Sequence, residues 1–213
     1  EGIYFDFVID EGSVIADGII SEVDSPVAII GTAEKGYLSL KLTSNYKSGH
    51  SSFPGQVTTI GKLSKAIYSL QKNQMSSKLV DPVKDFLLYV GPEMSLKSKF
   101  SISNTTLLSS SILLNLEQNP TTDAMIRTTM APTIINGGNK SNVLPSEASA
   151  IINFRIRQGD SIKKVKEHVL NTINDDDISV EVLSNTLFSE PSKVSSSSSS
   201  SFNIIHKTIK EIF

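Results

Sequence analysis

Two adjacent carboxylates follow an apolar run near the start of the chain. Asp10 and Glu11 come directly after residues 7–9 (FVI) and precede Gly12. A carboxylate at the end of a buried strand can project into a cleft, where it is available to a metal ion. An acidic pair before a glycine is more often a solvated turn, and a zinc site needs three or four ligands. Asp10 is therefore a candidate metal ligand that needs companions from outside this segment.

A histidine lies among small residues in the segment SGHSS at 48–52. The small side chains predict an exposed turn, in which the imidazole is free to donate a hydrogen bond. Most loop histidines are only solvated. His50 is a candidate catalytic residue because it combines exposure with a free donor. His168 and His206 lie beside apolar stripes of predicted helices and are interpreted as a surface residue and as a packing or capping residue.

An arginine and an asparagine could together hold an anion. Arg155 lies on the polar side of a predicted strand, and its guanidinium can grip a carboxylate through two parallel hydrogen bonds. Asn142 lies in the loop before that strand and can add amide hydrogen bonds. An ordinary cross-strand ion pair at the arginine is as common an arrangement. Both residues are candidates for substrate binding.

The spacing of apolar residues predicts the elements that position these candidates. Leu38, Leu40 and Leu42 alternate with polar residues, which is the period of a strand buried on one face. Apolar residues three and four apart, beginning with Ile60, predict a helix with one buried stripe. Strands are predicted at 37–43, 124–135 and 148–156 and from 180 onward, and helices at 59–71 and 162–173.

Two further stretches interrupt or extend this pattern. Residues 79–120 are predicted to be a helical insertion, which Asn119-Pro120 closes. Within it, Asp81-Pro82 predicts an N-cap and the first position of a helix, and a second helix is expected at 107–116. The seven serines at 195–201 cannot bury apolar area and predict a flexible connector before a terminal helix with one apolar face.

Apart from the insertion, the order of elements is strand, helix, strand, strand, helix, strand. Gly159 and Ser161 support this order, because they predict a turn and the N-cap of the second helix. The order indicates an α+β fold, a ferredoxin-like unit in which an antiparallel sheet carries two helices on one face. A single-stranded RNA binder can have the same order, but it needs exposed aromatic stacking positions that this pattern does not provide.

Composition narrows the classes of partner. The 213 residues carry a net charge of −2 and no cysteine, and the sequence pI is near 6.0. This balance gives no reason to expect nucleic acid or an anionic membrane surface as a partner. No window approaches the roughly 18 uninterrupted apolar residues of a membrane span. The missing cysteines exclude disulfides and thiolate metal sites, but they leave the compartment open.

Three motifs occur in the order that is found in a known family. The segments FVIDEG at 7–12, SGHSS at 48–52, and NVLP at 142–145 followed by NFRIR at 153–157 resemble aminoacylases and Gly-Xaa carboxypeptidases. These enzymes belong to the co-catalytic zinc metallopeptidase family that includes succinyl-diaminopimelate desuccinylase. The segments AEKG at 33–36 and NPTTDAMIRTT at 119–129 are similar to the N-acyl-amino-acid hydrolase and vacuolar carboxypeptidase branch.

The resemblance implies a role for each candidate residue. Asp10 matches a strand-end carboxylate that ligates one of two zinc ions. His50 matches a lid histidine that reaches the active site of the partner subunit and stabilises the oxyanion formed on water attack. Asn142 and Arg155 match lid residues that hold the substrate. The family's other zinc ligands and its general base have no counterpart in this sequence, so the chain by itself is expected to bind no zinc and to be inactive.

The resemblance also implies a division of the chain. Residues 1–24 are expected to be a stub of the zinc catalytic domain, residues 25–187 a lid that also dimerises, and residues 188–213 a connector and returning helix. Together with the absence of an initiator methionine, this division predicts a piece of a longer homodimeric hydrolase. Its substrate is expected to be a peptide or an N-acyl amino acid. The alternative is a stand-alone ferredoxin-like module for ligand binding or dimerisation, without catalysis.

Overall fold

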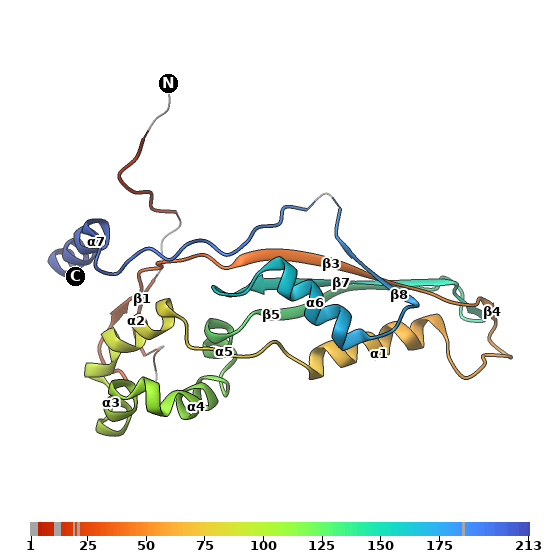
Figure 1. Cartoon of the computed structure of the whole chain (residues 1–213), viewed down its shortest axis with the longest axis horizontal. Coiled ribbons are helices and arrows are strands. Elements are labelled where there is room, and N and C mark those ends of the chain that lie inside the picture. Colours follow the sequence, from red (N-terminus) through yellow and green to blue (C-terminus); the bar gives the residue numbers. More distant parts are fainter. Residues whose placement is uncertain (1–3, 11–13, 19, 21, 185) are drawn as a thin grey trace. The chain divides into compact units, whose positions relative to one another are not determined.

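The structure is a computed structural model that describes residues 4–10, 14–18, 20, 22–184 and 186–213 (Figure 1). The chain divides into two compact units. One unit is built around a sheet and comprises residues 35–78 and 123–192. The other comprises residues 1–34, 79–122 and 193–213 and is mostly helical in its described part.

The sheet unit contains four antiparallel strands in the order β5-β7-β3-β8. Strand β3 spans Gly36–Asn45 and pairs along its whole length with β7, Glu147–Ile156. Strands β5, Thr129–Gly137, and β8, Ile178–Val182, form the two edges. The predicted alternation in β3 and β7 is confirmed, because Leu38, Leu40 and Leu42 are fully buried.

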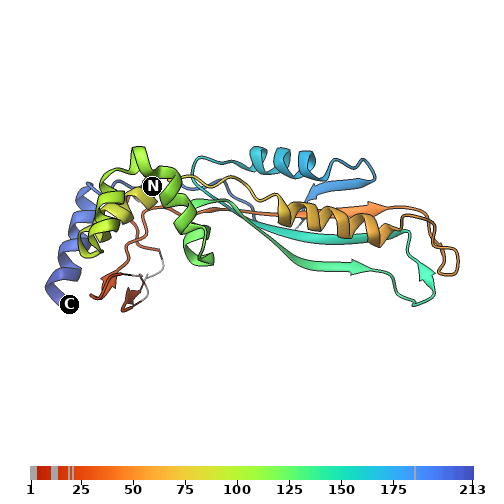
Figure 2. The same cartoon turned by 90° about the horizontal axis from the view of Figure 1, so that it is seen from below.

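Two helices complete the core of this unit. Helix α1 spans Thr59–Lys72 and helix α6 spans Ile162–Ile173. Their buried residues join the inward side chains of β3 and β7 in a single apolar cluster, so both helices cover the same face of the sheet (Figure 2). The predicted α+β architecture is therefore confirmed. Ile60 was wrongly placed in the buried stripe of α1: it is 40% exposed, and Thr59 is the buried residue at that end.

Local signals explain where these helices begin and end. The side chain of Thr58 accepts a hydrogen bond from the backbone of Gly61 at the start of α1. Ser161 caps α6 as predicted, accepting from the backbone of Lys164, and Gly159 before it has a φ of +87° that suits glycine. Helix α6 ends at Asn174 in the left-handed conformation, which asparagine tolerates.

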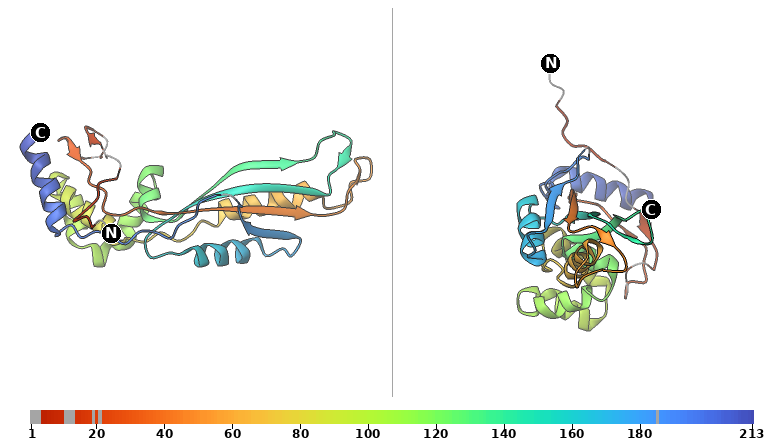
Figure 3. Two further views of the ribbon diagram at one scale, coloured as in Figure 1. Left: turned by 90° about the horizontal axis from the view of Figure 1, so that it is seen from above. Right: turned by 90° about the vertical axis from the view of Figure 1, so that its right-hand side faces the viewer.

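A short two-stranded pair extends one end of the sheet unit. Strand β4, Gly49–His50, pairs antiparallel with β6, Val143–Leu144. Strand β4 follows the end of β3, and β6 precedes the start of β7. Because β3 and β7 are antiparallel and in register, both short strands lie beyond the same end of the sheet (Figure 3, left).

The second unit contains helices from the insertion and from the end of the chain. Its described elements are β1 (Ile15–Ala16), β2 (Val27–Ala28), α2 (Asp81–Val90), a 3-10 turn at Gly91–Glu93, α3 (Leu96–Ser103), α4 (Thr105–Leu116) and α7 (Ser200–Ile212). The insertion is thus helical as predicted. Among the described residues, no helix is both long and apolar enough to span a membrane.

Two helix boundaries differ from the prediction. Val80 is the N-cap of α2 and makes no side-chain cap, while Asp81 is the first helical residue and pairs with Lys84 at 3.0 Å. Pro120 does not close the insertion but opens a further helix, α5, Pro120–Ile126. The side chain of Asn119 accepts from the backbone of Thr121 at 2.8 Å, and proline is favoured at a first helical position. The next strand consequently begins at Thr129 and not near 124.

Two predictions about the ends of the chain are also wrong. Residues 7–9 form no strand and are exposed, because no described strand lies beside them to pair with. The serine run is not a structureless connector. The backbone of Ser195 donates to the carbonyl of Thr32, Ser197 donates to Asp85 at 2.7 Å, and Ser199 caps α7. Serine serves well as a capping residue, which composition alone does not reveal.

Candidate functional site

His50 and Asn142 lie side by side at the tip of the sheet unit. His50 pairs with Val143 between β4 and β6, and the backbone of Ser51 donates to the carbonyl of Asn142 at 3.0 Å. Both His50 and Asn142 are exposed. Residues that are far apart in the sequence are thus brought together by the pairing of two strands of two residues each.

The contacts of the His50 ring define its hydrogen-bonding capacity. Its Nδ1 accepts a hydrogen bond from the backbone of Ser52 at 3.2 Å. In the neutral imidazole one nitrogen accepts while the other carries the proton. The acceptor role of Nδ1 therefore places the proton on Nε2, which can donate to an external oxygen. This is the capacity that an oxyanion-stabilising histidine requires.

The loop that carries Asn142 is tied to helix α1. The hydroxyl of Thr59, which is fully buried, donates to the carbonyl of Pro145 at 2.6 Å. At Gly137, a Cβ atom would lie 3.1 Å from the Cβ of Ala148, and Gly138 has a φ of +75°. These positions favour glycine and hold the loop close to the sheet. The tip is therefore built on the core and not on a free loop.

Arg155 lies near the opposite end of the sheet unit. It faces Tyr37 across β3 and β7, with its guanidinium carbon 4.8 Å from the centre of the Tyr37 ring. Arg155 lies eight positions along β7 from Glu147, which is the strand end nearest the tip. At about 3.3 Å per residue, this separation is roughly 26 Å. The structure thus brings His50 and Asn142 together, and it does not bring Arg155 to them.

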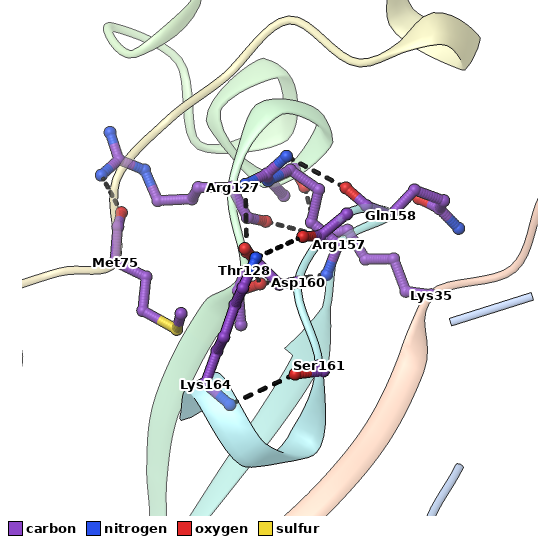
Figure 4. A network of polar contacts seen from close by, with 11 residues as sticks. Lys35, Met75, Arg127, Thr128, Arg157, Gln158, Asp160, Ser161 and Lys164 are labelled. Atoms are coloured by element: carbon purple, nitrogen blue, oxygen red, sulfur yellow. Dashed lines mark hydrogen bonds and ion pairs between the residues drawn. The ribbon is translucent and has the colours of Figure 1, made fainter. Parts of the chain in front are cut away.

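A network of polar contacts surrounds the end of the sheet that carries Arg155 (Figure 4). Arg127 binds Asp123 at 2.6 Å and the carbonyl of Met75 at 2.9 Å. Arg157, only 4% exposed, pairs with Asp160 at 3.1 Å. The hydroxyl of Thr128 also donates to Asp160, at 2.7 Å. The charged groups here are thus held by hydrogen bonds and ion pairs.

Lys35 is a residue of this end that the sequence analysis did not single out. Its Nζ atom donates to the carbonyls of Ala124 and Arg127, the latter at 2.8 Å, at the end of α5. Burial, and then the nearby charges of Arg157 and Arg155, lower the pKa of Lys35 to about 8. The only sequence signal was its place in the segment AEKG at 33–36, since a lysine before a strand looks like an ordinary surface residue.

The remaining candidates make separate contacts. Asp10 is exposed, while Glu11 and Gly12 lie outside the described residues. In the described part of the chain, no three His, Asp or Glu side chains gather where they could hold a metal ion. The Nε2 of His168 lies 2.8 Å from the carbonyl of Asn73, and His206 packs 6.2 Å from the rings of both Tyr89 and Phe202. These two histidines have structural contacts.

Comparison with protein families and curated proteins identifies the family of this chain. The family model described as "Peptidase dimerisation domain" matches residues 32–181. "Probable carboxypeptidase S-like 2" of Dictyostelium discoideum is 40% identical over 210 residues, covering 98% of this chain and 40% of that protein. "N-fatty-acyl-amino acid synthase/hydrolase PM20D1" of Xenopus tropicalis is 36% identical over 215 residues, covering 100% and 41%. The chain thus spans about two fifths of these curated relatives.

Solved structures show the same fold at low sequence identity. The dipeptidase Dug1p from Saccharomyces cerevisiae has a TM-score of 0.54 and 15% identity, over 84% of this chain and 41% of that one. The M20 family metallo-carboxypeptidase Sso-CP2 from Sulfolobus solfataricus has a TM-score of 0.51 and 17% identity, over 84% and 50%.

Proposed function

Because this chain belongs to the family of M20 peptidase dimerisation domains, we propose that it is the lid of a dimeric, zinc-dependent hydrolase that cleaves a peptide or N-acyl amide bond next to a free carboxylate. The names of the relatives support this substrate class. A carboxypeptidase substrate and an N-fatty-acyl amino acid both carry a carboxylate close to the bond that is cleaved.

The observation that carries the proposal is the separation of the two candidate groups. His50 and Asn142 lie at one end of the sheet unit, and Arg155 lies roughly 26 Å away by strand length. In an N-acyl amino acid, three covalent bonds separate the acyl carbon from the carboxylate carbon. One lid therefore cannot place His50 and Arg155 on the same substrate molecule. Two lids in a dimer can, if one subunit supplies the tip and the other supplies Arg155.

Each residue then has a defined task. The Nε2 proton of His50 stabilises the negative charge on the oxygen of the attacked carbonyl. The Asn142 amide hydrogen-bonds the substrate beside it, and the Arg155 guanidinium holds the carboxylate in a bidentate pair. Because Tyr37 supports the guanidinium from one side, Arg155 is oriented before the substrate arrives.

The zinc ions of the proposed enzyme are not held by this chain alone. Asp10, in the proposed catalytic stub at 1–24, is one candidate ligand, and one carboxylate does not make a zinc site. Zinc chemistry therefore belongs to other parts of the full-length enzyme. Residues 25–187 form the lid in this proposal, and residues 188–213 return the chain to the catalytic domain.

A zinc titration of this chain tests the proposal that the zinc ions are held mainly by other parts of the full-length enzyme. Calorimetry is expected to show no zinc site with submicromolar affinity, because the chain supplies too few ligands. The full-length enzyme is expected to bind two zinc ions per subunit. A tight stoichiometric site in the 213-residue chain would contradict the proposal.

A further inference from the structure

Lys35 lies at the same end of the sheet as Arg155. Tyr37 and Arg155 face each other in the register of β3 and β7, on the side opposite the buried pair Leu38 and Phe154. Lys35 directly precedes β3, and its side chain reaches the carbonyls of Ala124 and Arg127, which precede β5 on the other side of β7.

Two aspartates at this end of the sheet are already paired with arginines. Asp123 pairs with Arg127 and Asp160 pairs with Arg157. Neither Lys35 nor Arg155 forms an ion pair with a carboxylate in the part of the chain that is described. Lys35 donates instead to neutral carbonyls. Neither cation is thus in direct contact with a carboxylate in the described part of the chain, although the charge of Asp123 acts on Lys35 from nearby.

Arg157 is a further, buried donor at this end of the sheet. Arg157 is 4% exposed, and its Nε atom has no hydrogen-bond partner among the described residues. Burial and then the charge of Arg157 lower the pKa of Lys35, the charge of Asp123 opposes them, and the charge of Arg155 lowers the pKa further. A bound anion relieves the mutual repulsion of these cations, so the cluster is suited to a carboxylate.

We propose that Lys35 acts with Arg155 as a second, titratable cation that strengthens the binding of a carboxylate at this end of the lid. The proposal rests on the proposed function for the identity of the substrate, while the affinity for a simple carboxylate belongs to the chain itself. Lys35 is a specificity-determining residue in this scheme. Its Nζ stays hydrogen-bonded to the end of α5, and its positive charge attracts the carboxylate that Arg155 binds.

The direction of the pH effect follows from the charges. Lys35 is cationic below a pH of about 8 and neutral above it. The charged groups that face it are arginines and aspartates, residue types whose ordinary pKa values lie well outside the range from pH 7 to pH 9. These groups are Arg127, Arg155, Arg157, Asp123 and Asp160. Carboxylate affinity therefore falls as pH rises through about 8.

Fluorine NMR with para-fluorobenzoyl glycine as the carboxylate probe tests this on the 213-residue chain. The dissociation constant is expected to be about fivefold weaker at pH 9 than at pH 7, the effect of removing one charge a few ångströms from the ligand. Lys35→Met is expected to bind weakly at both pH values, and Lys35→Arg tightly at both. Circular dichroism checks that each variant folds.

The outcomes separate this inference from the proposed function. Lys35 is not the second cation if Lys35→Met keeps the fivefold pH effect. If Lys35→Met does not fold, a fivefold pH effect in Lys35→Arg leads to the same conclusion. If Arg155→Met leaves the affinity for the probe unchanged, the carboxylate site of the proposed function is wrong as well. Loss of affinity in Arg155→Met, together with an unaltered pH effect in Lys35→Met, overturns only the role of Lys35.

Discussion

Replacing His50 by alanine in the full-length enzyme is expected to lower kcat by about 100- to 1000-fold, the usual effect of removing one oxyanion donor. The structure gives the reason: Nδ1 of His50 accepts from the backbone of Ser52, which leaves Nε2 as a donor at an exposed tip. Zinc content and the midpoint of thermal unfolding are expected to stay unchanged, because the side chain makes no contact with the core. Steady-state kinetics and metal analysis of the purified variant measure both quantities.

His168→Ala is the matched control for this experiment. His168 also contacts a backbone group, the carbonyl of Asn73, but it does so on helix α6 away from the tip. It is expected to retain kcat within a factor of about two, while losing a few tenths of a kcal/mol to about 1 kcal/mol of stability. An equal loss of kcat in the two variants would show that His50 matters only for folding.

Replacing Arg155 by methionine is expected to raise KM for a carboxylate substrate by about 30- to 100-fold, with a smaller change in kcat. A charge-assisted hydrogen-bonded pair contributes about 2–3 kcal/mol when it is kept from water. Because the carboxylate does not react, the interaction is made in the ground state and in the transition state alike, and its loss appears mainly in KM. Initial rates over a range of substrate concentrations give both constants.

The matched control changes the substrate instead of the protein. An analogue with an amide in place of the carboxylate is expected to be a poor substrate of the unsubstituted enzyme and to be affected little by Arg155→Met. Arg155→Lys keeps the charge and loses the planar fork, so its KM is expected to lie between the two. A large effect on the amide analogue would mean that Arg155 supports the sheet through Tyr37 and does not bind the carboxylate.

The sheet and its helices could be predicted because burial imposes a period on the sequence. The apolar residues Leu38, Leu40 and Leu42 in β3 and the buried residues of β7 occupy every second position, since each strand faces the helices on one side only. Ser161 before α6 follows the same logic, because the first turn of a helix needs an acceptor for its free N–H groups. These signals are local, so they can be recognised in a single sequence.

The errors have two causes: a local cap that is compatible with either end of a helix, and contacts between residues distant in sequence. Pro120 is compatible with the end of one helix or the start of another, and the Asn119 side chain selects the second. The serines at 195–199 are held by Thr32 and Asp85, residues more than a hundred positions away. Residues 7–9 have the composition of a strand, but a strand also needs a neighbour to pair with.

The candidate site could likewise be predicted only in part from the sequence. The resemblance could point to His50, Asn142 and Arg155 as residue types at matching positions, but it contained no distances. The adjacency of His50 and Asn142 depends on the pairing of β4 with β6, which has too few residues to leave a pattern. Lys35 was missed because its partners, the carbonyls of Ala124 and Arg127, are backbone groups that no sequence motif reveals.

The central claim is that two lids of one dimer share each substrate, with the tip of one subunit and the Arg155 of the other. Co-expression of two differently tagged full-length chains, one carrying His50→Ala and the other Arg155→Met, allows the mixed dimer to be purified and its kcat/KM measured. One of its two sites then receives both intact groups and the other receives neither. The mixed dimer is expected to show about half the kcat/KM of the unsubstituted dimer, although each variant alone is nearly inactive at low substrate concentration. A mixed dimer as inactive as the two parental variants would mean that His50 and Arg155 reach a substrate from the same subunit, and it would contradict the account.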